Sequence, residues 1–449
     1  MAEVRTKHNA SAKIVKALGM FSGVKILEIF CSLVRNKLIA WYIGPVGLGF
    51  TILYNSIVNL ISQSSRLSID QSAQRNITQA SGKEVPIIIA VVRRWALWLG
   101  LSGCVLMCAL SPLLSYWSFD TTDEWPVFCL LSIVPLAYTI YTCNTAENQG
   151  LRRFRAVVRS SVVATLGGLL LSVPLIFVLG IDSIPWIIVI YGVSTWIASW
   201  IFRPKVEKIK VTKRQTIEMG RGFIKLGAQI TFALFVTQAL NYFLVLYINT
   251  FASTEELGIY QAGYTIMNSY VGIVFSAMWI EYFPRLTAMA HSPKRLSISA
   301  SHEVRVTLGL LTPLLCLLII LAKPVIYLIY SEDFLPIVPY IVLACVGVVL
   351  RVVSWCEAYV ILARGDGKTY IITEVLSSVI GLGLNILGFM YWGFLGLGMA
   401  YILWYAVYTL MIVWVCKYRY NVNLNRQTWL MFMVAIALTS LICCVSMFL

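Results

Sequence analysis

The chain has 449 residues, of which 59% are hydrophobic and only 12% are charged, and its formal net charge is +15. A soluble domain carries about 25% charged residues, so this composition excludes an ordinary soluble protein. It indicates an all-α polytopic membrane protein, in which apolar runs of roughly 20 residues cross the bilayer as helices. The 11 cysteines and 3 histidines show no metal-ligand spacing, and no nucleotide-binding loop is visible. We therefore expect no metal, no cofactor and no catalytic site.

The hydrophobic runs recur along the whole chain. A polar segment at 204–221 interrupts them and predicts a cytoplasmic loop between two six-helix lobes, 1–203 and 222–418. A further apolar run at 429–448 predicts a thirteenth span. The other predicted spans lie near residues 14–41, 45–65, 95–117, 125–146, 157–180, 184–202, 222–249, 257–283, 306–330, 335–362, 369–391 and 395–416.

The basic residues lie mainly on one side of these spans. Most of the 35 Lys and Arg residues fall in alternate loops, whereas the opposite loops carry acidic residues such as Asp123 and Glu255. This asymmetry is the positive-inside pattern, and it predicts a cytoplasmic N-terminus. The basic excess therefore reflects topology and contact with lipid headgroups. Nucleic acid is excluded as a partner.

The two predicted lobes resemble each other in sequence. Residues 16–50 run from KALGMF through a long helix to VGLGF, and residues 225–259 run from KLGAQI to ELGI. Because each lobe has an even number of spans, the repeat is parallel, with its axis along the membrane normal. Repeats of this kind are typical of transporters whose substrate path lies between the halves.

Five cations lie within predicted spans, where a charge normally faces a cavity or a partner. In the first predicted span, four polar residues at i, i+3, i+7 and i+10 lie within a helical stripe of roughly 80°: Lys25, Glu28, Ser32 and Arg35. This stripe is either a wet cavity face or a structural ion pair between Lys25 and Glu28. The five cations are Lys25, Arg35, Lys37, Lys323 and Arg351.

A second polar stripe follows on the next span, where Asn55, Asn59, Ser62 and Arg66 lie within roughly 60° of each other. Hydrogen bonding between helices is the alternative explanation of this stripe. A cationic cavity suits an anionic headgroup, because arginine binds phosphate bidentately and stays charged when desolvated. The substrate-binding cations that we predict are Lys25, Arg35, Arg66 and Arg351.

Neutral and acidic groups in the spans predict two further roles. Glu28 and Glu357 are candidate coupling carboxylates, unless Lys25 or Arg351 holds them in ion pairs. Neutral amides suit the hydroxyl groups of sugars. The candidate sugar-contacting residues are Asn55, Asn59, Gln238, Asn241, Gln261 and Asn268.

Several short motifs occur in a characteristic order: NTAENQGLRRFRA at the end of the fourth span, LGIY after a Glu-Glu pair, YSEDF before the tenth span and GFLGLGMAYIL at the twelfth. In this order and spacing the chain resembles the Wzx-type polysaccharide or O-antigen flippases of the multidrug/oligosaccharidyl-lipid/polysaccharide exporter superfamily. The resemblance implies two pseudo-symmetric six-helix lobes around a central cavity. The run at 429–448 departs from a twelve-span pattern.

The resemblance also implies a function in polysaccharide and lipopolysaccharide biosynthesis. Undecaprenyl-diphosphate-linked oligosaccharide would be moved from the cytoplasmic to the periplasmic leaflet of the bacterial inner membrane, with membrane lipids and a polysaccharide polymerase complex as partners. A lipid II flippase and a small-molecule or drug antiporter of the same superfamily are the alternatives. A membrane-embedded glycosyltransferase or polymerase is disfavoured, because the outer loops are short and hold no acid/base or metal constellation.

The predicted topology can be tested with reporter fusions. A fusion at Arg155 should report the cytoplasm, and a fusion at Asp123 should report the periplasm, because the inner loops hold the cations. A fusion after Leu449 should report the periplasm if 429–448 spans. Exchange of the first two results would overturn the assignment of spans.

Overall fold

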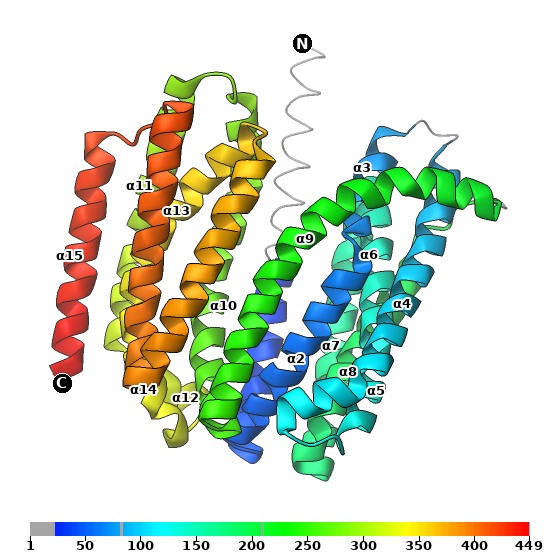
Figure 1. Ribbon diagram of the computed structural model, residues 1–449, viewed down its shortest axis with the longest axis horizontal. Coiled ribbons are helices and arrows are strands. Elements are labelled where there is room, and N and C mark those ends of the chain that lie inside the picture. The colour runs from blue at the N-terminus through cyan, green and yellow to red at the C-terminus, as the bar shows by residue number, and fades with distance from the viewer. Residues whose placement is uncertain (1–22, 81–83, 208, 210, 449) are drawn as a thin grey trace. The chain divides into compact units, whose positions relative to one another are not determined.

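The chain folds into two compact helical units. The computed structural model describes residues 23–80, 84–207, 209 and 211–448, apart from some side chains between 222 and 284 (Figure 1). The units are Met1–Tyr242 and Phe243–Leu449, and we call them the N-terminal and C-terminal units. Within the described ranges the regular structure is helical throughout, which confirms the predicted all-α class.

The N-terminal unit begins with a described helix at 23–42. Proline at the start of α2, α4 and α5 suits the first turn of a helix, where its missing N–H has no partner to lose. The remaining helices of this unit are α2 (Pro45–Arg66), α3 (Ile69–Gln79), α4 (Val85–Phe119), α5 (Trp125–Leu131), α6 (Ile133–Gly150), α7 (Phe154–Leu179), η1 (Gly180–Asp182), α8 (Ser183–Ile201) and α9 (Lys213–Phe251), which runs past the unit boundary.

One long element of the C-terminal unit, α14, contains two of the predicted spans. It bends at Gly393, where φ is 55°. This bend separates the spans predicted at 369–391 and 395–416. The helices of the unit are α10 (Thr254–Ala288), α11 (Pro293–Ile320), α12 (Ala322–Ile329), η2 (Glu332–Ile337), α13 (Val338–Ala363), α14 (Gly367–Tyr420) and α15 (Arg426–Phe448).

Eight helices in the described part of the chain are long and apolar enough to cross a membrane. One of these is the C-terminal helix, whose qualifying stretch is Arg426–Met447. In Figure 1 this helix, α15, forms the red edge of the C-terminal unit. The amides of Asn423 and Asn425, in the segment before it, donate hydrogen bonds to Ser297 and Ser301 of α11. Its position as a thirteenth membrane span stays a prediction.

Two segments that we expected in inner loops are helical. Residues 69–79 form α3, whose Ile69, Ala73 and Ile77 pack with α4 and α6 in one apolar core. The other residues of α3 are mostly polar, so this segment does not show the long apolar run that predicts a membrane span. Residues 213–221, predicted in the inter-lobe loop or at its edge, form the start of α9. Here Arg214 pairs with Glu218 one turn later, at 2.9 Å, which favours a helix.

The start of α14 is fixed by Asp366, which precedes its first turn. The carboxylate accepts hydrogen bonds from the amide and hydroxyl of Thr369, from Arg419 and from Tyr420. These bonds, with the Thr369 amide contributing most, lower the pKa of the Asp366 carboxyl. The cap therefore stays charged in mildly acidic solution and holds both ends of α14 together.

The bend of α14 gives a stability test. A methyl group built on Gly396 would lie 1.8 Å from the carbonyl oxygen of Gly388, and backbone cannot move aside as a side chain can. We expect Gly396→Ala to lower the free energy of unfolding by about 1–3 kcal/mol, measured as a lower thermal midpoint of the purified protein in detergent. Gly383→Ala is the control, because a methyl group there meets nothing within 4 Å. Equal midpoints for the two variants would contradict the close packing of these glycines.

Candidate functional site

The stripe on the first helix contains an ion pair. Lys25 Nζ lies 2.6 Å from a carboxylate oxygen of Glu28, and the side chain of Lys25 is 66% exposed whereas that of Glu28 is 24% exposed. The structure therefore contains the ion pair between Lys25 and Glu28, and the ammonium group remains accessible to solvent. An exposed pair of this kind contributes little to stability, so Lys25 can exchange Glu28 for another anion.

Arg35 lies on the same helix, and no carboxylate forms an ion pair with it within the described residues. Its guanidinium lies 5.4 Å from the ring centre of Tyr191 in α8, and its buried Nε has no hydrogen-bond partner in the described part of the chain. Tyr138 of α6 is also within electrostatic range. A cation–π contact lowers the cost of a partly buried cation without neutralising it. The positive charge of Arg35 is thus left available.

Two tyrosines complete this cluster. Tyr141 of α6 and Tyr191 both interact electrostatically with Lys25. Tyr191 packs closely on Gly168 of α7, where an added methyl group would lie 2.7 Å from the ring. We call the group the N-terminal cluster; it consists of Lys25, Glu28, Arg35, Tyr138, Tyr141 and Tyr191. It presents two cations, one carboxylate and several ring hydroxyls, a set that can bind an anionic group.

The polar stripe predicted on the second span, from Asn55 to Arg66 of α2, is less continuous in the structure than the spacing of its residues predicted. Asn55 donates to the carbonyl of Thr51 in its own helix, at 2.8 Å. Asn59 is exposed. Arg66 lies 3.7 Å from Asp70 of α3, an acidic partner that the helical stripe did not predict. Arg66 therefore has a counter-charge one turn away, across the break between α2 and α3.

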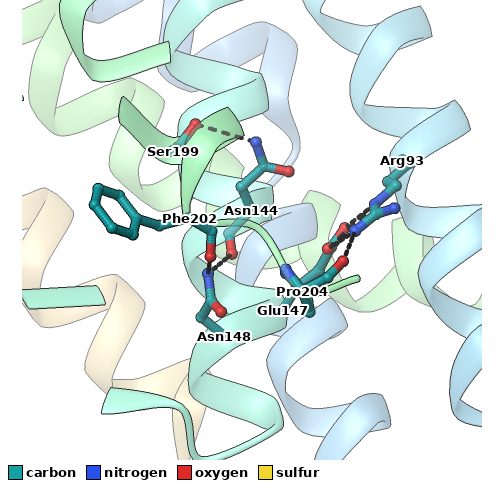
Figure 2. A network of polar contacts seen from close by, with 7 residues as sticks. All are labelled: Arg93, Asn144, Glu147, Asn148, Ser199, Phe202 and Pro204. Atoms are coloured by element: carbon teal, nitrogen blue, oxygen red, sulfur yellow. Dashed lines mark hydrogen bonds and ion pairs between the residues drawn. The ribbon is translucent and has the colours of Figure 1, made fainter. Parts of the chain in front are cut away.

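A buried polar network fixes the neighbouring ends of α4, α6 and α8 (Figure 2). Arg93 binds both carboxylate oxygens of Glu147, at 3.0 and 2.6 Å, and also donates to the carbonyl of Pro204 at 3.0 Å. The side chain of Glu147 is fully buried, whereas that of Arg93 is 30% exposed. Asn144 and Asn148, on the same helix as Glu147, donate to Ser199 Oγ and to the carbonyl of Phe202.

The residues next to Arg93 bind the segment that follows α8. Arg94 donates to the carbonyl of Val211, at 2.8 Å, and to the hydroxyl of Thr216. Trp95 Nε1 donates to the carbonyl of Thr216 at 2.9 Å. Three consecutive side chains of α4 therefore attach the predicted inter-lobe segment to the N-terminal unit, and the start of α9 is part of the same packing.

The C-terminal unit surrounds its one predicted substrate cation, Arg351, with aromatic rings. The guanidinium lies 5.2 Å from the ring centre of Phe275 in α10 and 5.5 Å from that of Tyr405 in α14. It also donates to the hydroxyl of Tyr401 at 3.3 Å. Glu374 interacts with it electrostatically and accepts a hydrogen bond from Tyr408. Arg351 is thus held by rings and hydroxyls.

Glu357 is not the partner of Arg351. Its side chain is buried, with a relative exposure of 1%, and one carboxylate oxygen has no hydrogen-bond partner within the described residues. Tyr282, which lies nearby, donates to the carbonyl of Cys356 instead. Glu357 is therefore a buried acid whose charge has no counter-ion in the described part of the chain.

The predicted sugar-contacting amides do not form one cluster of hydrogen bonds in the described residues. Gln238 is half-buried and Asn241 is exposed, both in the N-terminal unit. Gln261 is half-buried in the C-terminal unit, and its carbonyl oxygen has no partner among the described residues. The side chain of Asn268 lies outside the described residues.

The comparisons with known proteins agree with this architecture. The profile of a family described as polysaccharide biosynthesis protein matches residues 74–339. The chain belongs to this family. The sequence matches no curated protein significantly. The predicted relationship to the polysaccharide exporters is confirmed at the level of family and fold, and the family supports a flippase or transporter in the membrane.

Solved structures give the fold. The inward-closed form of the lipid II flippase MurJ has a TM-score of 0.71 and 14% identity, covering 95% of this chain and 97% of that one. An inward-facing multidrug resistance MATE transporter of the MOP superfamily has a TM-score of 0.72 and 14% identity, covering 88% and 98%. A MOP superfamily transporter from Pyrococcus furiosus has a TM-score of 0.62 and 14% identity, covering 90% and 96%.

The family match includes Arg93 and Glu147, whose pairing the sequence analysis missed. A signal was present, since Glu147 stands between Ala146 and Asn148 in the NTAENQG motif at the end of an apolar span. Its partner was not visible, because Arg93 was assigned to a loop, whereas it lies within α4. Pairing between distant helices has no sequence period to reveal it.

The Arg93–Glu147 pair gives a second stability test. Arg93→Ala should lower the free energy of unfolding by about 3–5 kcal/mol, because it leaves a buried carboxylate without a partner. Replacing both residues by Met and Leu should restore most of the loss, as an apolar pair leaves no orphaned charge. Thermal midpoints in detergent measure both effects.

Arg214→Ala is the matched control for Arg93→Ala. Arg214 and Glu218 are 88% and 62% exposed, and such a surface pair contributes about 0–1 kcal/mol. If Arg93→Ala proves as mild as Arg214→Ala, the buried pair is not a structural anchor.

Proposed function

We propose that this protein is a flippase that moves undecaprenyl-diphosphate-linked oligosaccharide, an O-antigen or related repeat unit, from the cytoplasmic to the periplasmic leaflet of the bacterial inner membrane by alternating access. The family description, polysaccharide biosynthesis protein, supports this class of substrate. The multi-pass fold supports transport rather than chemistry on the substrate. Membrane lipids and a polysaccharide polymerase complex remain the proposed partners.

The observation that carries the proposal is the N-terminal cluster. Within the described residues, Arg35 has no ion-pair partner and its buried Nε has no hydrogen-bond acceptor. A buried donor without an acceptor is costly, so this position favours an anion. A diphosphate fits, because its oxygens can accept from Arg35, and the ammonium group of Lys25 interacts with the same tyrosine, Tyr191, that Arg35 contacts.

The charge of the cluster also separates the proposal from one of its two alternatives, a drug exporter. An exporter of cationic drugs needs an acidic binding surface, and here Glu28 is already paired with Lys25. A lipid II flippase would use the same cations, because lipid II carries the same diphosphate group. The likeness to MurJ is one of fold, so transport of lipid II is the outcome that the functional assay must separate.

The four predicted cations are not equally able to bind the diphosphate. Arg66 has Asp70 as a partner, and Arg351 is surrounded by Phe275 and Tyr405. We therefore assign the diphosphate to Lys25 and Arg35, with Arg66 as an entry contact after separation from Asp70.

Glu357 is the proposed coupling carboxylate. It is buried and has one oxygen without a partner in the described residues. A carboxyl in this setting can take up or release a proton when water reaches it. Glu28 is a weaker candidate, because Lys25 is already its ion-pair partner.

Arg35→Ala tests the proposal. Binding of farnesyl diphosphate, a soluble short-chain analogue, is measured by calorimetry on the purified protein. Loss of a hydrogen bond to a charged group is worth about 1.5–3 kcal/mol, so the Kd should rise by roughly 10- to 150-fold. Arg35→Lys should recover part of the affinity, because it keeps the charge and loses the bidentate fork. Lys37→Ala, a change at an exposed cation of the same helix, is the control.

Transport is then compared in proteoliposomes loaded with lipid-linked O-antigen units or with lipid II. We expect translocation of the first substrate and its loss in Arg35→Ala at unchanged protein abundance. Preferential translocation of lipid II would replace the proposed substrate. Full activity of Arg35→Ala and Lys25→Ala would show that these cations are structural.

A further inference from the structure

The partly exposed face around Arg351 is not a lipid face. On α14, the side chains of Leu403, Val407, Leu410 and Trp414 are 53%, 41%, 71% and 63% exposed and recur on one side of the helix. This apolar stripe suits lipid. The other side of α14 carries four aromatic residues, and the guanidinium of Arg351 from α13 lies against them. They are Tyr401, Trp404, Tyr405 and Tyr408. A charged group within a span faces protein or water, so this aromatic side does too.

The aromatic rings of this face are fixed from behind. Tyr401 packs on Gly347 and Trp404 on Gly381, where added methyl groups would lie 2.5 and 2.4 Å from the rings. Trp404 Nε1 also donates to Ser377 Oγ at 2.9 Å. The rings therefore keep their orientation without a bound molecule, and such preorganisation reduces the entropy lost on binding.

The rings also form a continuous surface. Tyr405 stacks on Trp404 with ring centres 4.9 Å apart and an angle of 29°, and its centre lies 4.7 Å from that of Tyr401. The hydroxyls of Tyr401 and Tyr405 interact with each other, and Tyr401 accepts from Arg351. The surface thus combines flat apolar faces with a few oriented polar groups, the composition of a small-molecule site.

We infer that this aromatic surface, defined by Arg351, Tyr401, Trp404 and Tyr405, is a saccharide-binding subsite, separate from the diphosphate-binding cations of the N-terminal cluster. The inference rests on the proposed function. The apolar C–H face of a sugar ring packs on an aromatic ring, and sugar hydroxyls exchange hydrogen bonds with tyrosine hydroxyls. The positive charge of Arg351 disfavours an organic cation, which would otherwise bind aromatic rings well.

Arg351 has a positioning role in this subsite. Its guanidinium already contacts Phe275 and Tyr405 and donates to Tyr401. It is therefore poorly placed to bind a phosphate bidentately. It orients the Tyr401 hydroxyl instead. This assignment differs from the diphosphate role that the sequence alone suggested for Arg351.

Two probes separate the subsite from the diphosphate site. One is farnesyl diphosphate, which carries no sugar. The other is the free oligosaccharide released by mild acid from the lipid-linked intermediates of the strain that carries the gene. Binding of each to the purified full-length protein is measured by calorimetry.

Tyr405→Leu should weaken binding of the oligosaccharide about tenfold or more and leave binding of farnesyl diphosphate within about twofold. Arg35→Ala should give the reverse pattern. Tyr405→Phe, which keeps the ring, should retain most of the oligosaccharide affinity. Trp414→Leu, on the lipid stripe of the same helix, should change neither. Unchanged binding of farnesyl diphosphate also shows that Tyr405→Leu is folded.

The outcomes distinguish the two proposals. If the wild-type protein binds farnesyl diphosphate but not the oligosaccharide, or if Tyr405→Leu binds the oligosaccharide normally, the saccharide subsite is wrong and the proposed function stands. If Tyr405→Leu loses both probes while Tyr405→Phe keeps both, the ring is structural and the subsite is also wrong. If the wild-type protein binds neither probe, the proposed function itself fails.

Discussion

A charge inside an apolar helix bundle must meet a counter-charge, an aromatic ring or water, because transfer of an ion from water to hydrocarbon is too costly otherwise. This constraint organises the N-terminal unit. Glu147 is fully buried only because Arg93 binds both of its oxygens. That ion pair joins α4 to α6 and, through Pro204, to the segment after α8. The helices that carry Tyr138 and Tyr191, and hence the surroundings of Arg35, are positioned around it.

The same constraint is met differently at the two predicted arginines. In the described part of the chain, Arg35 contacts the ring of Tyr191 and has an unsatisfied Nε, whereas Arg351 contacts two rings and a tyrosine hydroxyl. The first arrangement leaves the Nε of Arg35 for a ligand, whereas the second holds the guanidinium of Arg351 against two rings and a tyrosine hydroxyl. The residue type alone could not distinguish them, because both arginines lie within apolar helices. Their neighbours come from other helices, at sequence distances that carry no period.

Sequence patterns predicted the helices well where the apolar runs were long. The bend at Gly393 falls between the spans predicted at 369–391 and 395–416. The patterns failed where helices are polar: α3 and the start of α9 were assigned to loops because their apolar residues are few. One of these errors affected the interpretation of Arg66, a predicted substrate-binding cation. With 66–94 taken as a loop, no contact was expected between Arg66 and Asp70, four residues apart, and their ion pair was missed.

Among the residues that the structure describes, Glu357 is a buried charge that no counter-ion satisfies. Two possible donors lie close to it, but each is engaged with a backbone carbonyl: Tyr282 with that of Cys356, and Cys416 with that of Glu357 itself. The carboxylate oxygen that lacks a partner in the described residues can be satisfied by a proton or by water. A proton makes the group neutral and compatible with burial, whereas the charged form requires contact with water. A change in the hydration of α13 would therefore change the protonation of Glu357, which is the property that ion coupling requires.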